Sequence, residues 1–338
     1  MHDAIAKETS MRAALQDYCW QHDGRAVPLG VGCAGIYLKW QDKTERRETI
    51  SFLHEAYDEG VRYFDTSGDY GDSELLLGEL IKDADRKKLF IASKAPYPLD
   101  GSRKRAFEVF KRTFYLSFER LKTDFIDFYQ IHDTNSFAVC ADDAIPFLKE
   151  RKKDGMIGYM GLGTRSLKAH EHAIVYGSVD GCLSHYEYNL LSTASKRLQE
   201  LARQNDVAFV NASCLMPGYL VDYSGNLIGT DSEQDDNLPF SLAQRKKNAA
   251  KIRGLCERMG MNPLAAALQF SISGTDVSFT LVGLNNTKEL KACIQNIDAV
   301  IYPEQWAAIK RLMRENPTLD ISEEYKSHGF LTKKDRDE

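Results

Sequence analysis

Long apolar runs are missing from this chain of 338 residues. No stretch approaches the ~20 consecutive apolar residues that a membrane-spanning helix needs. The first residues, MHDAIAKETSMRAALQDYCWQ, lack an apolar run behind a positive flank, which argues against a secretory signal peptide. We therefore expect no membrane partner and no secretion.

Disulfide and metal signatures are also missing. The chain has 7 cysteines, an odd number, with no C-x-x-C pair among them. Such usage is typical of free thiols in a reducing compartment, so we predict a cytoplasmic protein. His170 and His172 lie two residues apart in a predicted helix and point to different faces, so we predict no metal site.

A basic excess is the third absence. Lys and Arg total 44 against 49 Asp and Glu, for a formal net charge of −5. Nucleic-acid binding needs a basic footprint that this balance does not give. We expect a small-molecule substrate, no nucleic-acid partner, and a monomer or small homo-oligomer.

Short apolar segments alternate with amphipathic ones from Leu29 onward. This pattern predicts buried parallel strands separated by helices. The strand candidates are 31–36, 61–65, 89–94, 125–131, 157–163, 181–187, 207–213 and 279–283. Eight strands with a helix after each predict an α/β fold of the closed (β/α)8 class, the TIM barrel.

Two segments break this alternation. Residues 1–20 are predicted to be helical, so we assign a helical N-terminal extension to 1–25 and a single barrel domain to 26–338. Residues 221–240 are polar, acidic and Gly-containing. In a barrel they follow the seventh strand. They are then either a flap over the substrate or cofactor or a disordered insertion.

Four polar side chains come at the ends of three successive strand candidates. Asp65 lies in VRYFDT and Tyr70 follows it, Lys94 closes LFIASK and His132 closes FIDFYQIH. Each alone has a structural explanation, as a cap, a packing residue, a solvated lysine or an interior histidine. Because barrels gather their chemistry at the carboxyl ends of their strands, their coincidence predicts an active site.

A tyrosine beside a lysine can exchange a proton near neutral pH. A free phenol has a pKa of about 10, and a neighbouring ammonium lowers it by favouring phenolate. We predict Tyr70 as general acid/base, tuned by Lys94, which Asp65 orients. His132 would donate a hydrogen bond to a substrate oxygen. None of these groups carries hydride, so a nicotinamide must supply it.

The segment GVGCAG at 30–35 has the spacing of a dinucleotide-binding fingerprint. That motif requires a strand before it and a helix after it. Here the glycines fall inside the first strand candidate, and the following IYLKWQDK is a poor helix opening. We therefore reject a Rossmann domain.

Residues 60–78, GVRYFDTSGDYGDSELLLG, resemble the aldo-keto reductase pattern G-x-R-x-x-D-T-A-x-x-Y-G-x-S-E-x-x-x-G, with Ser67 in place of the usual Ala. Lys94 and His132 match the other two active-site positions of that family. The resemblance extends from Leu29 to around residue 300. It implies a barrel oxidoreductase that uses NAD(P)(H).

The resemblance also implies where the cofactor binds: a glycine of the first strand, positions after the fifth to seventh strands, and small polar residues beside the adenosine phosphates. These positions are Gly32, Gly163, Thr164, His185, Ser213, Leu215, Gly283, Asn285, Asn286 and Thr287. Leu284 stands where a Lys often marks 2′-phosphate recognition. This departure favours NAD over NADP, with Lys288 and Lys291 leaving NADP open.

The dipeptide His132-Asp133, with NASCLMPG and LVGL, resembles the branch of galactose dehydrogenase and related aldose 1-dehydrogenases. We therefore predict NAD(P)-dependent oxidation of a sugar hemiacetal or an alcohol. The alternatives are a broad NADPH-dependent aldehyde or ketone reductase and a non-catalytic barrel acting as a binding or regulatory subunit. Tyr37, Trp40, Tyr97 and Asp133 are expected to wall the substrate pocket; packing against neighbouring loops is the alternative for the aromatic residues.

Overall fold

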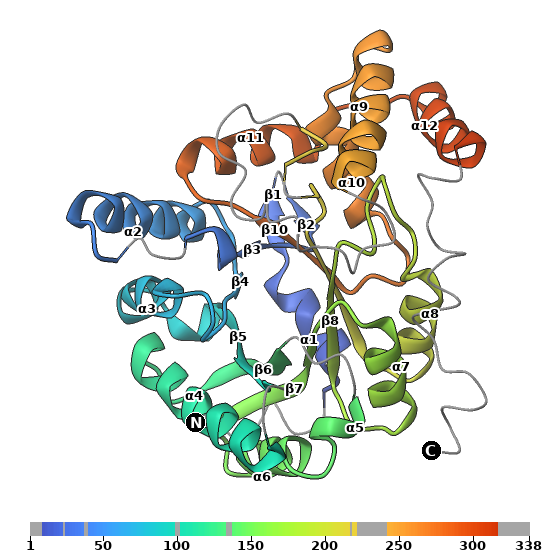
Figure 1. Ribbon diagram of the computed structural model, residues 1–338. Helices are drawn as coiled ribbons and strands as arrows, with labels where there is room; N and C mark the ends of the chain where they lie inside the picture. The colour runs from blue at the N-terminus through green and yellow to red at the C-terminus, as the bar shows by residue number, and fades with distance from the viewer. Residues whose placement is uncertain are drawn as a thin grey trace.

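Eight parallel strands close into a barrel in a computed structural model that describes residues 9–22, 24–36, 40–98, 102–132, 137–216, 218–221 and 242–316, with side chains from 246 onward in the last range. The strands follow the order β10-β3-β4-β5-β6-β7-β8-β9 around the barrel. Helices surround them in a ring (Figure 1). The predicted (β/α)8 class is confirmed.

The barrel strands match the strand candidates to within a few residues. They are β3 (Leu29–Gly32), β4 (Tyr63–Asp65), β5 (Phe90–Pro96), β6 (Ile126–His132), β7 (Ile157–Gly163), β8 (Gly181–His185), β9 (Ala208–Ala212) and β10 (Phe279–Gly283). Every neighbouring pair is parallel. Their carboxyl ends therefore meet at one mouth of the barrel.

The helices on the outside follow the strands along the chain. They are α2 (Lys43–Asp58), α3 (Ser73–Asp83), η3 (Arg86–Lys88), α4 (Arg103–Leu121), α5 (Phe137–Cys140), α6 (Ala144–Lys153), α7 (Leu167–Val175), α8 (Lys196–Gln204), α9 (Leu242–Arg258), α10 (Pro263–Ile272), α11 (Thr287–Ile297) and α12 (Pro303–Glu315). No helix in these described ranges is long and apolar enough to cross a membrane. All seven cysteines are free and buried.

The first barrel strand begins and ends earlier than predicted. We expected a strand over 31–36, but β3 ends at Gly32 and Cys33–Ile36 form a 3-10 turn, η2. The Ser73 hydroxyl at the start of α3 donates to the Cys33 carbonyl at 3.0 Å. The Cys33 carbonyl is therefore bonded to a side chain of α3. In a longer strand it would have been available to a neighbouring strand instead.

In the described part of the N-terminal segment, helical structure covers fewer residues than predicted. Within 9–20, helical structure is confined to α1 (Met11–Ala14) and the 3-10 turn η1 (Leu15–Tyr18). A hairpin follows, in which β1 (Trp20–His22) pairs antiparallel with β2 (Arg25–Val27). Gly24, with φ +78°, makes the reversal that other residues rarely adopt. Residues 1–8 lie outside the described part of the chain.

The barrel interior is filled with apolar side chains at its N-terminal end. Alternate residues of each strand point inward, and they form one cluster with Met11 and Leu15. The Tyr63 ring lies 4.7 Å from that of Phe90 and 5.0 Å from that of Phe279, centroid to centroid. The α1 segment therefore closes this end, and it lies within the outline of the ring in Figure 1.

Candidate active site

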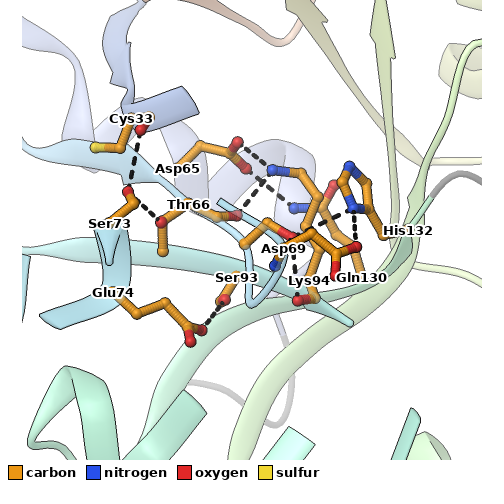
Figure 2. A network of polar contacts seen from close by, with 11 residues as sticks. Cys33, Asp65, Thr66, Asp69, Ser73, Glu74, Ser93, Lys94, Gln130 and His132 are labelled. Carbon is orange, nitrogen blue, oxygen red and sulfur yellow. Dashed lines mark hydrogen bonds and ion pairs between the residues drawn. The ribbon is translucent and has the colours of Figure 1, made fainter. Parts of the chain in front are cut away.

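Three of the predicted catalytic residues lie on adjacent strands at the open mouth. Asp65 ends β4, Lys94 lies near the end of β5 and His132 ends β6. Asp65 comes two residues after Tyr63, Lys94 four after Phe90, and His132 four after Phe128, and all three aromatic residues point into the barrel. Because side chains alternate along a strand, an even spacing means that the three polar side chains point inward as well. Figure 2 shows these side chains gathered in one network.

Lys94 is the centre of this network, with only 1% of its surface exposed. Its amine forms an ion pair with Asp65 Oδ1 and donates to the Thr66 carbonyl at 2.8 Å. Burial, the largest influence, lowers the pKa of Lys94, but Asp65 and Tyr70 together outweigh it and raise the pKa to about 12. Lys94 is therefore a fixed ammonium throughout the physiological pH range.

Tyr70 reaches this ammonium from the turn after β4. Lys94 Nζ lies 4.8 Å from the centroid of the Tyr70 ring, and a hydrogen bond with Tyr70 contributes to the raised pKa of Lys94. The Tyr70 ring meets the His132 ring edge-on, with centroids 5.5 Å apart. The four predicted catalytic side chains are thus in one small volume, and Tyr70 is the half-buried one.

Backbone bonds fix the turn that carries Tyr70. Thr66 N donates to the Ala92 carbonyl at 2.8 Å, and Gly68 N donates to the Lys94 carbonyl at 3.0 Å. These bonds extend the β4–β5 ladder by two steps beyond the end of β4. The position of the tyrosine relative to the lysine is therefore set by the sheet itself.

Two polar residues that sequence reasoning missed complete the network. Gln130 Nε2 donates to Asp65 Oδ2 at 3.1 Å, so both oxygens of that carboxylate have partners. Asp69 Oδ2 lies 3.0 Å from His132 Nδ1. Gln130 could have been found as the inward residue two positions before His132; Asp69 carries no signal in the sequence beyond its place next to Tyr70.

A buried carboxylate supports the site from behind. Glu74, fully buried on α3, accepts from the Ser93 hydroxyl at 2.6 Å and from Arg120 at 3.3 Å. Burial raises the pKa of Glu74, and the bonds from Ser93 and Arg120 oppose that rise. Because Ser93 precedes Lys94 on β5, this cluster links α3 and α4 to the strand that carries Lys94.

The glycines predicted to meet the cofactor serve two different purposes. Among the described residues, a Cβ on Gly283 would have no atom within 4 Å, so its backbone is open at the mouth, whereas one on Gly32 would make an ordinary van der Waals contact at 3.7 Å. A Cβ on Gly163 would lie 2.9 Å from Lys94 Cδ and 2.8 Å from Gln130 Oε1. Gly163 therefore makes room for the Lys94 side chain.

His185, at the end of β8, keeps a neutral imidazole. Burial, followed by the positive charges of Arg165 and Lys94, holds the pKa of His185 well below its usual range. Thr164, after β7, is buried, and its carbonyl accepts from His170 Nε2 at 2.9 Å. Of the two predicted contacts after β9, Ser213 has a left-handed φ of +60° and Leu215 is buried.

Carboxylates surround the predicted adenosine-phosphate residues. Glu289 accepts from the Asn285 backbone N–H at 2.8 Å and from the Asn286 side chain at 3.1 Å. The Thr287 hydroxyl donates to Glu55, which also pairs with Lys291 at 2.9 Å. These bonds from Thr287 and Lys291 lower the pKa of Glu55. Two negative charges therefore lie beside residues 285–287.

The predicted substrate-pocket residues are only partly described. Tyr37, Asp133 and the whole of 222–240 fall outside the described residues. Trp40 is half-buried, with its ring 4.9 Å from the Arg46 guanidinium. Tyr97 is 2% exposed, and its hydroxyl donates to Asp143 at 2.8 Å. These surroundings favour the packing alternative for Tyr97.

The mouth fits a nicotinamide dinucleotide. Gly283 leaves open backbone there, and the buried Asn285 Oδ1 has no hydrogen-bond partner among the residues that the structure describes. An extended ligand with hydrogen-bond donors would use both. Within the described residues, no group of three or more His, Cys, Asp or Glu could hold a metal ion.

Comparisons with known proteins agree with this geometry. A family model described as the Aldo/keto reductase family matches residues 28–314. L-galactose dehydrogenase from Arabidopsis thaliana is 25% identical over 262 residues, which cover 75% of this chain and 78% of that protein. D-threo-aldose 1-dehydrogenase from a Pseudomonas species is 25% identical over 296 residues, which cover 79% of this chain and 88% of that protein.

Solved structures show the same fold. The holo form of an aldo-keto reductase from Bacillus halodurans superposes with a TM-score of 0.64 at 19% identity, covering 87% of this chain and 95% of that one. A second, from Pseudomonas aeruginosa, gives a TM-score of 0.58 at 22% identity, covering 84% of this chain and 99% of that one.

Proposed function

This chain belongs to the aldo/keto reductase family of NAD(P)-dependent oxidoreductases, and from that premise we propose that it oxidises a sugar hemiacetal or an alcohol, with NAD as the preferred coenzyme and Tyr70 as general acid/base. One observation carries the proposal: the buried Lys94 ammonium, held by Asp65, lies 4.8 Å from the Tyr70 ring centroid. A fixed positive charge at that place stabilises a phenolate.

Tyr70 transfers the proton, and the charged and polar residues around it hold it ready for that transfer. A nicotinamide held at the mouth would supply the hydride-accepting chemistry. Tyr70, as phenolate, takes the proton of the reacting hydroxyl, and Lys94 stabilises the phenolate beforehand. Asp65 keeps the ammonium in place, and Gln130 holds the second oxygen of Asp65. In the opposite direction Tyr70 returns the proton to a carbonyl oxygen.

The substrate class is supported by the names of two relatives. L-galactose dehydrogenase and D-threo-aldose 1-dehydrogenase both act on sugars by name, and the chain matches at least 78% of the length of each. A hemiacetal hydroxyl is also a chemically suitable substrate, because its oxidation needs one hydride acceptor and one proton acceptor at the same site.

A coenzyme-reduction screen over aldoses and simple alcohols tests this function. We expect NAD reduction with at least one aldose and a fall of at least about 10²-fold in kcat for Tyr70→Phe, because general acid/base catalysis contributes that much or more. Coenzyme binding, followed by fluorescence, should survive the substitution. A preference for simple aldehydes with NADPH would instead identify a carbonyl reductase, and an undiminished kcat in Tyr70→Phe would remove the assigned acid/base.

The coenzyme preference rests on Glu289 and Glu55. Their carboxylates would repel a 2′-phosphate at residues 285–287, and Lys291, one of the two lysines that could help to bind NADP, is already paired with Glu55. We expect Glu289→Gln to raise the NADP-to-NAD ratio of kcat/KM by about 5-fold, since a like charge near the surface is worth roughly 1 kcal/mol. The matched control is Lys288→Gln, measured in the same way. An unchanged NADP-to-NAD ratio of kcat/KM in Glu289→Gln would contradict this reason for the preference.

A further inference from the structure

Gln130 makes a hydrogen bond that crosses a barrel strand. It lies fully buried on β6, and its register partner on the neighbouring strand β5 is Lys94. Its Nε2 nevertheless donates to Asp65 Oδ2 at 3.1 Å, at the end of β4. Because β5 lies between β4 and β6 in the barrel, this bond passes across the strand that carries Lys94 (Figure 2).

The chemistry of Asp65 fixes the direction of the Gln130 amide. A carboxylate in an ion pair only accepts hydrogen bonds, so the amide must turn its N–H group toward Asp65. The other end of the amide, Gln130 Oε1, is buried and has no hydrogen-bond partner among the residues that the structure describes. A buried acceptor without a partner lowers stability. The described contacts therefore use this amide for its donor end, and that end is bonded to Asp65.

The bond from Gln130 fixes the plane of the Asp65 carboxylate. The last torsion of an aspartate side chain has broad energy wells, so a carboxylate held at one oxygen can still rotate. Here Oδ1 forms the ion pair with Lys94 and Oδ2 accepts from Gln130. With both oxygens held from different strands, Oδ1 stays directed at the ammonium.

The Lys94 ammonium passes this constraint on to Tyr70. An ammonium has three N–H donors in a fixed tetrahedral arrangement. One is directed at Asp65, a second at the Thr66 carbonyl at 2.8 Å, and a further bond joins Lys94 to Tyr70. Once the first two directions are set, the third is set as well. A rotation of the Asp65 carboxylate would therefore turn the ammonium away from the phenol.

Gln130 carries no charge, which separates its effect from that of the charges around Tyr70. Titratable side chains of three strands and of the Tyr70 turn face the phenol or lie behind its partners: Lys94, His132, Asp65 and Asp69. A neutral substitution at Gln130 changes none of these charges. A change in the proton affinity of Tyr70 in such a variant would come from the orientation of its partners.

We propose that Gln130 is a positioning residue: its bond to Asp65 keeps the Lys94 ammonium directed at Tyr70 and so makes the phenol release its proton more readily. This inference rests on the proposed function, in which Tyr70 is the general acid/base. No proton moves at Gln130 itself, because the transfer stays between Tyr70 and the substrate.

Carbon-13 nuclear magnetic resonance of the full-length protein tests this role without coenzyme or substrate. The Cζ signal of a labelled tyrosine shifts when its phenol ionises, and the Tyr70 signal is assigned by its loss in Tyr70→Phe. Gln130→Met keeps the length of the side chain and removes the donor. We expect the midpoint of the Tyr70 titration to rise by about 0.5 to 1 pH unit, because a tenfold loss of phenolate stabilisation equals one unit. An unmoved midpoint overturns the inference.

Two further variants separate the bond from packing. Gln199→Met removes a buried glutamine of α8 whose Nε2 donates to Ser195 at 2.8 Å, outside this network, and it should leave the Tyr70 midpoint unchanged. Gln130→Glu keeps the length of the side chain. Because two adjacent carboxyls cannot both ionise easily, the new one keeps a proton at neutral pH and can still donate to Asp65.

Kinetics with the substrate that reacts fastest in the screen give a second measurement. In Gln130→Met we expect kcat at neutral pH to fall by about 10-fold, because a catalytic group is slightly misplaced, with KM for coenzyme within about twofold of the natural value. Gln130→Glu should keep kcat at neutral pH within about threefold. Equal losses in the two variants would mean that packing, and not the donated bond, is responsible, and would refute the role.

Gln130→Glu also decides the question if Gln130→Met does not fold. The shared proton leaves as the pH rises, and the bond to Asp65 is lost with it. The kcat ratio of the natural protein to this variant should therefore grow with pH. A constant ratio overturns the inference.

The failure of this inference differs from the failure of the proposed function. If no alcohol or aldose reduces coenzyme, the proposed function fails, while the carbon-13 midpoints still show whether Gln130 acts on Tyr70. If substrates are oxidised but the midpoint stays in Gln130→Met, the proposed function stands and only the role of Gln130 is overturned.

Discussion

The two ends of the barrel are built from the same strands and have opposite characters. At the N-terminal end, Tyr63, Phe90 and Phe128 pack with Met11 and Leu15 in an apolar cluster. At the mouth, two to four residues further along each strand, the interior positions carry a carboxylate, an ammonium, an amide and an imidazole. The period of two is the same at both ends, and only the chemistry of the side chains changes.

This contrast shows how a buried ion pair is kept in a barrel. An isolated ammonium in a closed interior would lose its proton or destabilise the fold. Lys94 instead has Asp65 and the Thr66 carbonyl as partners. The apolar end supplies the stability of the fold, and the polar end holds a charge in place next to Tyr70.

The largest effect is expected from Lys94→Met, which breaks the polar end. Tyr70 loses its positive neighbour, and Asp65 remains buried without a counter-charge. We expect kcat to fall by about 10³-fold or more and the free energy of unfolding to fall by about 3–5 kcal/mol. Steady-state kinetics and urea denaturation measure the two effects separately.

The double variant Asp65→Asn with Lys94→Met sharpens this test. It removes both charges, so we expect most of the lost stability to return while kcat stays low. Recovery of activity together with stability would mean that Lys94 acts only through the fold.

Phe128→Ala breaks the apolar end. The ring is fully buried and fills the space left by Gly161 and Gly181, where an added Cβ would lie 2.9 Å from Cε2 and 3.1 Å from Cζ of the ring. We expect a loss of about 3–5 kcal/mol in the free energy of unfolding, with KM for coenzyme unchanged below the melting temperature. A selective rise in KM would contradict the separation of the two ends.

A buried histidine without a counter-charge gives a pH test. Burial lowers the pKa of His170 from 6.5 to about 4, against the bond to the Thr164 carbonyl, which raises it. Between pH 6.5 and about 4, the unfolded chain therefore binds a proton at His170 that the folded chain does not bind. The free energy of unfolding decreases as the pH falls through this window. The loss reaches about 3 kcal/mol near the lower end.

Denaturation midpoints of the natural protein and His170→Gln across this window measure the effect. The glutamine amide nitrogen corresponds in position to Nε2 of the histidine and can still donate to Thr164, so the variant should keep its stability at neutral pH and lose part of the pH dependence. Parallel curves for the two proteins would show that other groups cause the acid sensitivity.

The smallest effect separates two glycines of β7. A Cβ on Gly163 would lie 2.9 Å from Cδ of the Lys94 side chain, whereas one on Gly161 would lie 1.9 Å from the Gly181 backbone oxygen. We expect Gly163→Ala to lower kcat by about 10-fold, because a small misplacement of a catalytic group is enough, with little loss of stability. Gly161→Ala should lower the melting temperature more and the kcat of the folded fraction less. The reverse pattern would disprove the assigned roles.

Local patterns predicted most of the fold and the centre of the site. The short apolar strands and amphipathic helices gave the barrel, and Asp65, Lys94 and His132 were found because each ends a strand. The N-terminal hairpin was missed because its two strands have only three residues each, too few for a periodic signal. The end of β3 was missed because it depends on Ser73, 40 positions further along.

The sequence by itself determined which chemical groups this protein can use and on which side of each strand they lie, since residue type and alternation are local properties. Only the tertiary structure decided which groups meet: Gln130 on Asp65, Asp69 on His132, and Gly163 against Lys94. Those contacts depend on the relative register of neighbouring parallel strands, which are joined through long crossover connections. Barrel closure sets that register, and no stretch of sequence between two strands specifies it.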